Sequence, residues 1–406
     1  MKFNGRHATL KDVQTTTAEA LLKTLVDSPS STTSQTDVRR THEILANALS
    51  ALGFKNNWIR DPTSKTADLL VAERPGKRSS GSLATFITCV SHIDTVLSPV
   101  EAGKYRREET ASGVRARGAG ILDNKGGLAV LVESLRLFLL TNSNPEISFR
   151  VVSSPDEETG SSAWHENFRQ AGLDSAAVLG FEPALDDGAI ISSRRGNRWY
   201  NIEIRGAEAH AGRCKGEEIN AAHEAARMIS RFLEVRDRLG ISLNVGHVEG
   251  GRDRHNVVCG SVRMKLDTRF TTFAERDALH KALVEIFNSP SENSNDGRKS
   301  EVSFEIVDDC PPFAADSKTE TLIGELCSIV AARENRTTLQ ATKAGGAGDV
   351  NHMSRPGLLV LDGLGPVGGR MHTKEEFLEL STLQSRAEAL SLWYPTLIKY
   401  CHAPSI

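Results

Sequence analysis

The chain carries, at residues 83–96, the sequence LATFITCVSHIDTV, an apolar run that ends in a histidine and an aspartate. The apolar part, Leu83 to Val90, has the length and composition of a strand that is buried on both faces. His92 and Asp94 follow, so they are expected just beyond the carboxyl end of that strand. Ligands bind at the carboxyl ends of parallel strands, and this stretch therefore indicates both a fold class and the position of a site.

Two further segments repeat this arrangement of a strand followed by acidic residues. Ile147 to Val152 is followed by Asp156-Glu157-Glu158, and Ala177 to Gly180 is followed by Glu182-Pro183. A helix is expected from Asn124 to Leu140, between the first and second of these strands. Strands that alternate with helices predict an α/β fold with a mostly parallel sheet flanked by helices.

The order of elements changes near Asn197. The sequence beyond it predicts, in order, a strand at Trp199–Arg205, a helix at Glu217–Arg238, strands at Ile241–Val248 and Val257–Arg269, a helix at Thr272–Asn288 and a strand at Val302–Val307. This β-α-β-β-α-β order is that of a ferredoxin-like α+β unit. We therefore expect an α/β domain in two parts, 1–197 and 311–406, interrupted by an inserted domain at 198–310.

Composition excludes several classes of protein. The 406 residues include 49 basic and 52 acidic side chains, and aromatic residues make up 5%. A chain without net positive charge and with few aromatic residues is not expected to bind nucleic acid. The most apolar segment, Leu128 to Leu140, is interrupted by charged residues, so no membrane span is expected.

The beginning of the chain and its cysteines indicate the compartment. Met1 to His7 lacks the apolar stretch of a secretory signal. The six cysteines are scattered and form no CxxC pair. We therefore expect reduced thiols and a cytoplasmic location.

Five polar clusters are candidates for a metal site. They are His92-x-Asp94, Asp123-Asn124-Lys125-Gly126-Gly127, Asp156-Glu157-Glu158, Glu182-Pro183 and Met371-His372. A set of two histidines and three carboxylates drawn from them would match what borderline divalent ions bind. Each cluster alone is more typical of a solvated loop or a strand-to-helix connection. Their joint placement after successive buried strands favours a shared site.

In that order, the clusters resemble the family of co-catalytic dizinc hydrolases. This family includes glutamate carboxypeptidase, aminoacylase, acetylornithine deacetylase and succinyl-diaminopimelate desuccinylase, and the glutamate carboxypeptidase branch is the most similar. The resemblance covers nearly the whole chain. It implies a dizinc exopeptidase-like catalytic domain, an inserted lid and dimerisation domain, and a homodimer.

The resemblance also implies a role for each cluster. His92, Asp123 and Glu182 would hold one metal ion, and Asp123, Glu158 and His372 the other, with two Zn²⁺ expected and Mn²⁺ or Co²⁺ as alternatives. Asp94 would fix the tautomer of His92. Glu157 would be the general base that activates a bridging water. If the segment is extended, Glu157 and Glu158 point in opposite directions, which suits this division.

The inserted domain carries further matches. In Gly206-Ala207-Glu208-Ala209-His210-Ala211-Gly212, His210 resembles the lid histidine that reaches the partner subunit's site and stabilises the oxyanion. Without the resemblance, it would be a polar histidine in a turn. Asn256 and Arg269 match residues that hold the substrate's free carboxylate, and the alternative for Arg269 is an ion pair with Asp267.

Three departures from the family pattern concern the substrate rather than the metals. Cys310 occupies the position of a basic residue, Gly348 that of a hydroxyl residue, and Cys259 that of a proline. The first hypothesis is therefore a hydrolase that cleaves an amide bond, in a peptide or an N-acyl amino acid, next to a free carboxylate. The alternatives are a deacylase or aminohydrolase of small non-peptide molecules, including aromatic ones, and a non-catalytic binding protein on the same scaffold.

Overall fold

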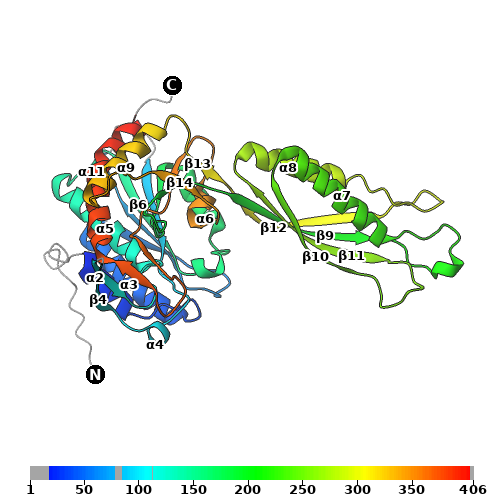
Figure 1. Cartoon of the computed structure of the whole chain (residues 1–406), viewed down its shortest axis with the longest axis horizontal. Helices are drawn as coiled ribbons and strands as arrows, with labels where there is room; N and C mark the ends of the chain where they lie inside the picture. Colours follow the sequence, from blue (N-terminus) through cyan, green and yellow to red (C-terminus); the bar gives the residue numbers. More distant parts are fainter. Residues whose placement is uncertain (1–17, 78–84, 112, 403–406) are drawn as a thin grey trace. The chain divides into compact units, whose positions relative to one another are not determined.

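The computed structural model describes residues 18–77, 85–111 and 113–402 (Figure 1). The chain divides into two compact units. The first contains the described residues up to Ser193, Ala315–Ala344 and the residues from Gly348 onward, and the second contains Arg194–Ala314 and Gly345–Ala347. The sequence analysis expects an inserted domain at 198–310, and these domain boundaries stay a prediction. Met1 to His7 and the expected strand start, at residues 83–84, lie outside the described residues.

A mixed six-stranded sheet forms the centre of the first unit. Its order is β1 (Lys55–Ile59), β2 (Leu69–Arg74), β6 (Ser148–Ser154), β3 (Phe86–His92), β7 (Ser175–Gly180) and β15 (Leu359–Leu361). The last four strands run parallel, whereas β1 and β2 pair antiparallel at one edge. Every residue of β3 and β6 is buried, which explains the apolar run at the start of β3. The predicted mostly parallel sheet is confirmed.

Helices cover both faces of this sheet. The main core includes side chains from α2 (Ala18–Asp27), α3 (Gln35–Ala51), α5 (Lys125–Thr141), α9 (Glu320–Arg333) and α11 (Leu380–His402), whereas α6 (His165–Leu173) and α10 (Asp349–Met353) pack together against β7 (Figure 1). In the described part of the chain, no helix is long and apolar enough to cross a membrane. The apolar helix α5, for example, contains a charged pair in which Arg136 donates two hydrogen bonds to Glu133.

A small sheet of the first unit was not expected from the sequence. Its order is β16 (Gly368–Gly369), β17 (Phe377–Glu379), β5 (Gly113–Arg117) and β4 (Arg106–Thr110). These strands are short, and apart from the buried Ala116 and Leu378 their residues are half-buried or exposed, so they lack an apolar pattern. The sheet brings the segment before Asp123 next to the segment after His372.

The second unit has the ferredoxin-like element order. Its antiparallel sheet has the order β10 (Ser242–Gly250), β11 (Ser261–Phe270), β9 (Gly196–Arg205) and β12 (Glu301–Cys310), and α7 (Ala221–Leu239) and α8 (Phe273–Phe287) cover one face (Figure 1). The side chain of Asn220 caps α7, so this helix begins four residues later than expected. Thr272 caps α8, which begins one residue after its expected start.

The remaining described elements are short. They are α4 (Pro99–Ala102), the 3₁₀ turns η1 (Glu157–Thr159) and η2 (Ala211–Arg213), and the strands β8 (Ile190–Arg194), β13 (Phe313–Ala314) and β14 (Ala341–Ala344).

Candidate metal centre

The ends of three parallel strands supply most of the candidate ligands. β3 ends at His92, β6 leads into η1 with Glu157 and Glu158, and β7 leads to Glu182. Because these strands are parallel, their carboxyl ends lie at the same edge of the sheet. The other two ligands, Asp123 and His372, come from the loops before α5 and between β16 and β17.

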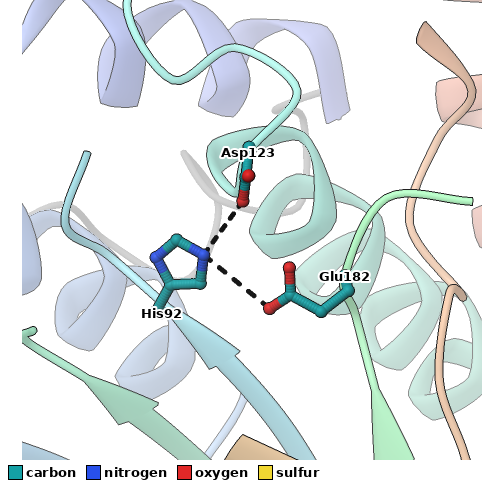
Figure 2. Close-up of side chains that lie close together, drawn as sticks. All are labelled: His92, Asp123 and Glu182. Carbon is teal, nitrogen blue, oxygen red and sulfur yellow. Dashed lines mark hydrogen bonds and ion pairs between the residues drawn. The ribbon is translucent and has the colours of Figure 1, made fainter. Parts of the chain in front are cut away.

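One group of three ligands surrounds the imidazole of His92 (Figure 2). His92 Nε2 lies 3.0 Å from Asp123 Oδ1 and 3.7 Å from Glu182 Oε1. Asn124 Nδ2 donates to Glu182 Oε1 over 2.8 Å and thereby orients this carboxylate. One atom from each of the three residues lies within 4.8 Å of the others, as the ligands of a single ion must.

A second group shares Asp123 with the first. His372 Nε2 lies 3.2 Å from Asp123 Oδ2 and 3.1 Å from Glu158 Oε2. Asp123 therefore presents one carboxylate oxygen to each group. The structure brings together all five side chains that the sequence analysis assigned to metal binding.

Gly127 allows the start of α5 to lie close to the end of β7. A Cβ atom at Gly127, in the first turn of α5, would lie 1.9 Å from the carbonyl oxygen of Phe181. Only glycine fits there. The start of α5 can thus lie directly against the end of β7, which places Asp123 beside Glu182.

Asp94 holds both groups in place. Its Oδ1 accepts hydrogen bonds from His92 Nδ1 and from the backbone N–H of Glu157, each over 3.1 Å. Its Oδ2 accepts from the backbone N–H of Glu158 over 3.2 Å and from the hydroxyl of Thr32 over 2.7 Å. A proton on Nδ1 of His92 leaves Nε2 free to bind a metal.

The expected extended conformation of Glu157 and Glu158 is wrong. They lie in the 3₁₀ turn η1, in which successive side chains are about 120° apart. This geometry still separates the two carboxylates. Glu158 faces His372, whereas Glu157 Oε1 lies 3.9 Å from the position of a Cβ atom at Gly348.

The electrostatics of the cluster fit two divalent cations. Burial raises the pKa of Glu182 well above its usual value and raises that of Glu158 to about 7. Burial opposes ionisation of Asp123 as well, but hydrogen bonds with His372 and His92 outweigh it and lower the pKa. The hydrogen bond to Asp123 raises the pKa of His372 to about 9. Divalent ions would replace these protons.

One unpartnered atom supports the same conclusion. Glu158 Oε1 is buried and has no hydrogen-bond partner among the described residues. An isolated buried carboxylate oxygen is costly unless it binds a cation. Imidazole nitrogens and carboxylate oxygens together suit Zn²⁺, Mn²⁺ and Co²⁺.

Glu376 was missed in the sequence. Its buried carboxylate accepts backbone hydrogen bonds from Gly120 over 3.1 Å, Leu122 over 2.8 Å and Asp123 over 2.9 Å. Burial raises the pKa of Glu376 to about 7. The acidic pair Glu375-Glu376 resembles an ordinary solvated loop, so only its position four residues after His372 could have signalled this role.

The candidate substrate residues lie in the second unit. His210 and Asn256 are exposed, and Asn256 Nδ2 lies 3.3 Å from His210 Nε2. Arg269 Nε lies 2.9 Å from Asp267. This ion pair is the alternative that the sequence analysis gives to a role of Arg269 in substrate binding. Cys310 is buried, and the two aspartates before it contact Asn197 and Arg198.

The fold and the candidate site define a class of protein: an α/β metal-dependent hydrolase with an inserted α+β domain. Residues 192–295 match the family described as the peptidase dimerisation domain of the M20 peptidases. The chain is 26% identical over 338 residues to carboxypeptidase G2 from Pseudomonas sp. (strain RS-16), with 82% of this chain and 79% of that protein covered. It is 22% identical over 356 residues to succinyl-diaminopimelate desuccinylase 2 from Shewanella loihica, with 84% and 90% covered.

A solved structure shows the same fold over almost the whole chain. Aminopeptidase PepT from Bacillus cereus matches with a TM-score of 0.66 at 18% identity, and the match covers 98% of this chain and 100% of that one. The homologues and structural neighbours of this chain are M20 metallopeptidases and deacylases, and the chain is a hydrolase that acts on amides. The predicted resemblance is confirmed.

Proposed function

We propose that this hydrolase uses two metal ions to cleave an amide C–N bond next to a free carboxylate, in a dipeptide or an N-acyl amino acid. The observation that carries the proposal is the pair of ligand groups joined by Asp123. His92 and Glu182 complete one group, and Glu158 and His372 complete the other. Zn²⁺ is the first candidate metal, because it binds imidazole and carboxylate ligands in catalytic sites.

The roles of the side chains follow from their chemistry. Two bound divalent ions supply Lewis acidity and stabilise negative charge that develops on the substrate. Glu157 takes a proton from the attacking water and passes it to the leaving nitrogen. Burial raises the pKa of Glu157, which makes it a better proton acceptor. Asp94 keeps His92 in the tautomer that binds metal.

The substrate side of the proposal rests on the second unit. His210 would stabilise the oxyanion, and Asn256 and Arg269 would hold the substrate carboxylate. Arg269 contacts Asp267 through Nε. The guanidinium fork has further N–H donors with which to bind a carboxylate. The matched relatives are named as a carboxypeptidase and a desuccinylase, so a peptide bond and an N-acyl bond are the first two bonds to test.

Assembly and location are parts of the same proposal. The match to a dimerisation domain supports a homodimer in which His210 serves the site of the partner subunit. The six cysteines are free, which supports a reducing compartment such as the cytoplasm.

The test combines one variant with a substrate panel. The zinc-loaded protein is assayed against dipeptides, N-acyl amino acids and aromatic amides. We expect E157Q to lower kcat about 10²–10⁴-fold, because the general base is lost, while metal content is unchanged. E146Q removes an exposed carboxylate from a turn in the same unit and serves as the control. Near wild-type turnover of metal-loaded E157Q would contradict the mechanism.

A second variant distinguishes the substrate classes. R269A is expected to reduce kcat/KM only for substrates with a free carboxylate. An equal effect of R269A on all substrates, or none on any, would favour the deacylase or aminohydrolase of small non-peptide molecules.

A further inference from the structure

Glu376 joins the two loops that carry the shared ligand and the most exposed ligand. Asp123 ends a loop that follows β5, and His372 lies in the loop that precedes β17. β5 and β17 pair antiparallel, with Phe377 opposite Arg117. The start of the loop that carries Asp123 therefore lies next to the end of the loop that carries His372, and the Glu376 carboxylate connects the two loops.

The bonds made by Glu376 are directed at the backbone of the Asp123 loop. One oxygen accepts from Leu122 and Asp123, and the other accepts from Gly120. On its own side, the backbone N–H of Glu376 donates to Thr373, and that of Thr373 donates to Arg370. His372 is thus held in a short hydrogen-bonded turn, and the Glu376 side chain links this turn to the backbone of Asp123.

The two ligand groups differ in how well their histidines are supported. The side chain of His92 is fully buried, and Asp94 fixes its Nδ1. The side chain of His372 is 52% exposed, and its ring contacts are with Asp123 and Glu158, which belong to the same metal group. The position of His372 therefore depends on its turn. Two contacts tie this turn to the segment before α5, namely the Glu376 carboxylate and a hydrogen bond from Arg117 to the carbonyl oxygen of Glu375.

We propose that Glu376 is a positioning residue that sets His372 against Asp123 and thereby determines the affinity for the ion held by Asp123, Glu158 and His372. This inference rests on the proposed two-metal function and adds a residue to it. Residues that orient metal ligands typically contribute about 10–100-fold to metal affinity or activity.

The test measures metal content and activity separately. Wild type and E376Q are dialysed against increasing chelator concentrations, and zinc per chain is determined by elemental analysis. We expect a range in which wild type keeps two ions and E376Q keeps one, as H372A does. Adding zinc should restore the kcat of E376Q, which a purely structural defect would not allow. E375Q, at the exposed neighbour, removes the same charge and should retain both ions.

Circular dichroism establishes whether E376Q is folded. If it is not, E376D decides, because it keeps the charge but shortens the reach to Gly120 and Leu122, and it should lose the same ion first. Retention of both ions with wild-type affinity, or loss of both at the same chelator concentration, would overturn the inference. A wild type that holds at most one ion would overturn the proposed function and the inference with it.

Discussion

Asp94 accepts four hydrogen bonds, and each one fixes a different part of the candidate site. The donors are the ring of His92, the hydroxyl of Thr32 and the backbone N–H groups of Glu157 and Glu158. The Asp94 carboxylate therefore fixes the ring of His92, a candidate ligand in the first metal group. It also fixes the backbone of Glu158, which belongs to the second group, and of Glu157, the proposed base. The pattern His-x-Asp reveals only the first of these contacts.

A second buried residue gives a prediction about pH. His42 is fully buried and hydrogen-bonds Ser153 over 2.9 Å, and its ring makes an edge contact with Trp58. Burial lowers the pKa of His42 to about 3, although the charge of Asp94 partly opposes this. Below pH 6.5 the unfolded chain therefore binds a proton at this residue that the folded chain does not. This contribution to stability is complete above pH 6.5 and is lost as pH falls.

We expect the wild type to lose stability relative to H42L by about 1 kcal/mol per pH unit between about pH 6 and pH 4. Urea unfolding at several pH values measures this difference in the free energy of unfolding. The change of the difference with pH is not affected by any loss of stability that the substitution causes equally at every pH. H223L, at an exposed histidine, is the control and should show no such slope. A difference between wild type and H42L that is the same at all pH values would show that His42 does not act in this way.

At the scale of elements, α11 fixes the loops near Glu182. Arg386 in this helix is fully buried and donates to Glu334 over 2.9 Å and to the carbonyl oxygens of Gly363 and Gly188. Gly188 precedes β8, and Gly363 follows β15. The helix thus ties the segment that follows Glu182 to the segment that follows β15.

R386M should be strongly destabilising. It leaves Glu334 and two carbonyl groups without this donor, and loss of one partner of a buried ion pair typically costs about 3–5 kcal/mol. R333M, which removes a half-exposed ion pair with Glu388, should cost less than about 1 kcal/mol. Both values come from the midpoint and slope of urea unfolding. Equal costs for the two variants would mean that the buried network contributes no more than a surface pair.

At the scale of the whole molecule, the two units have separate cores. The main core draws on the sheet, α5 and α11, whereas the second core draws on β9, β11, α7 and α8. The five candidate ligands all lie in the first unit, as do Asp94, Glu157 and Glu376. Metal binding should therefore stabilise one unit only.

Removal of metal tests this expectation. An ion that binds only the folded state stabilises it by about 2.7 kcal/mol at 100 times its Kd. In a W199F variant, the remaining tryptophans, Trp58, Trp164 and Trp393, all lie in the first unit. We expect a chelator to lower the Tm reported by their fluorescence and to leave the unfolding of the second unit unchanged. A fluorescence Tm that is insensitive to chelator would contradict metal binding in the first unit.

The sequence determined those parts of the fold that local patterns encode. The apolar run of β3 predicted a strand that is buried on both faces, and the alternation of strands with helices predicted a mostly parallel sheet. The residues at their carboxyl ends became candidates by the same reasoning, but the choice of Glu158 rather than Glu157 as a metal ligand required the family resemblance. His372 required the family resemblance, because a histidine in a glycine-rich loop has no local signal.

Only the tertiary structure decided the contacts between distant segments. The small sheet that pairs β5 with β17 has no apolar pattern, and Glu376 lies 253 residues from Asp123 in the chain. The sequence at residues 83–96 predicted that a site should lie at the carboxyl end of a buried strand. Backbone hydrogen bonds and burial decide which carboxylates hold that site, because these depend on neighbours that the local sequence does not contain.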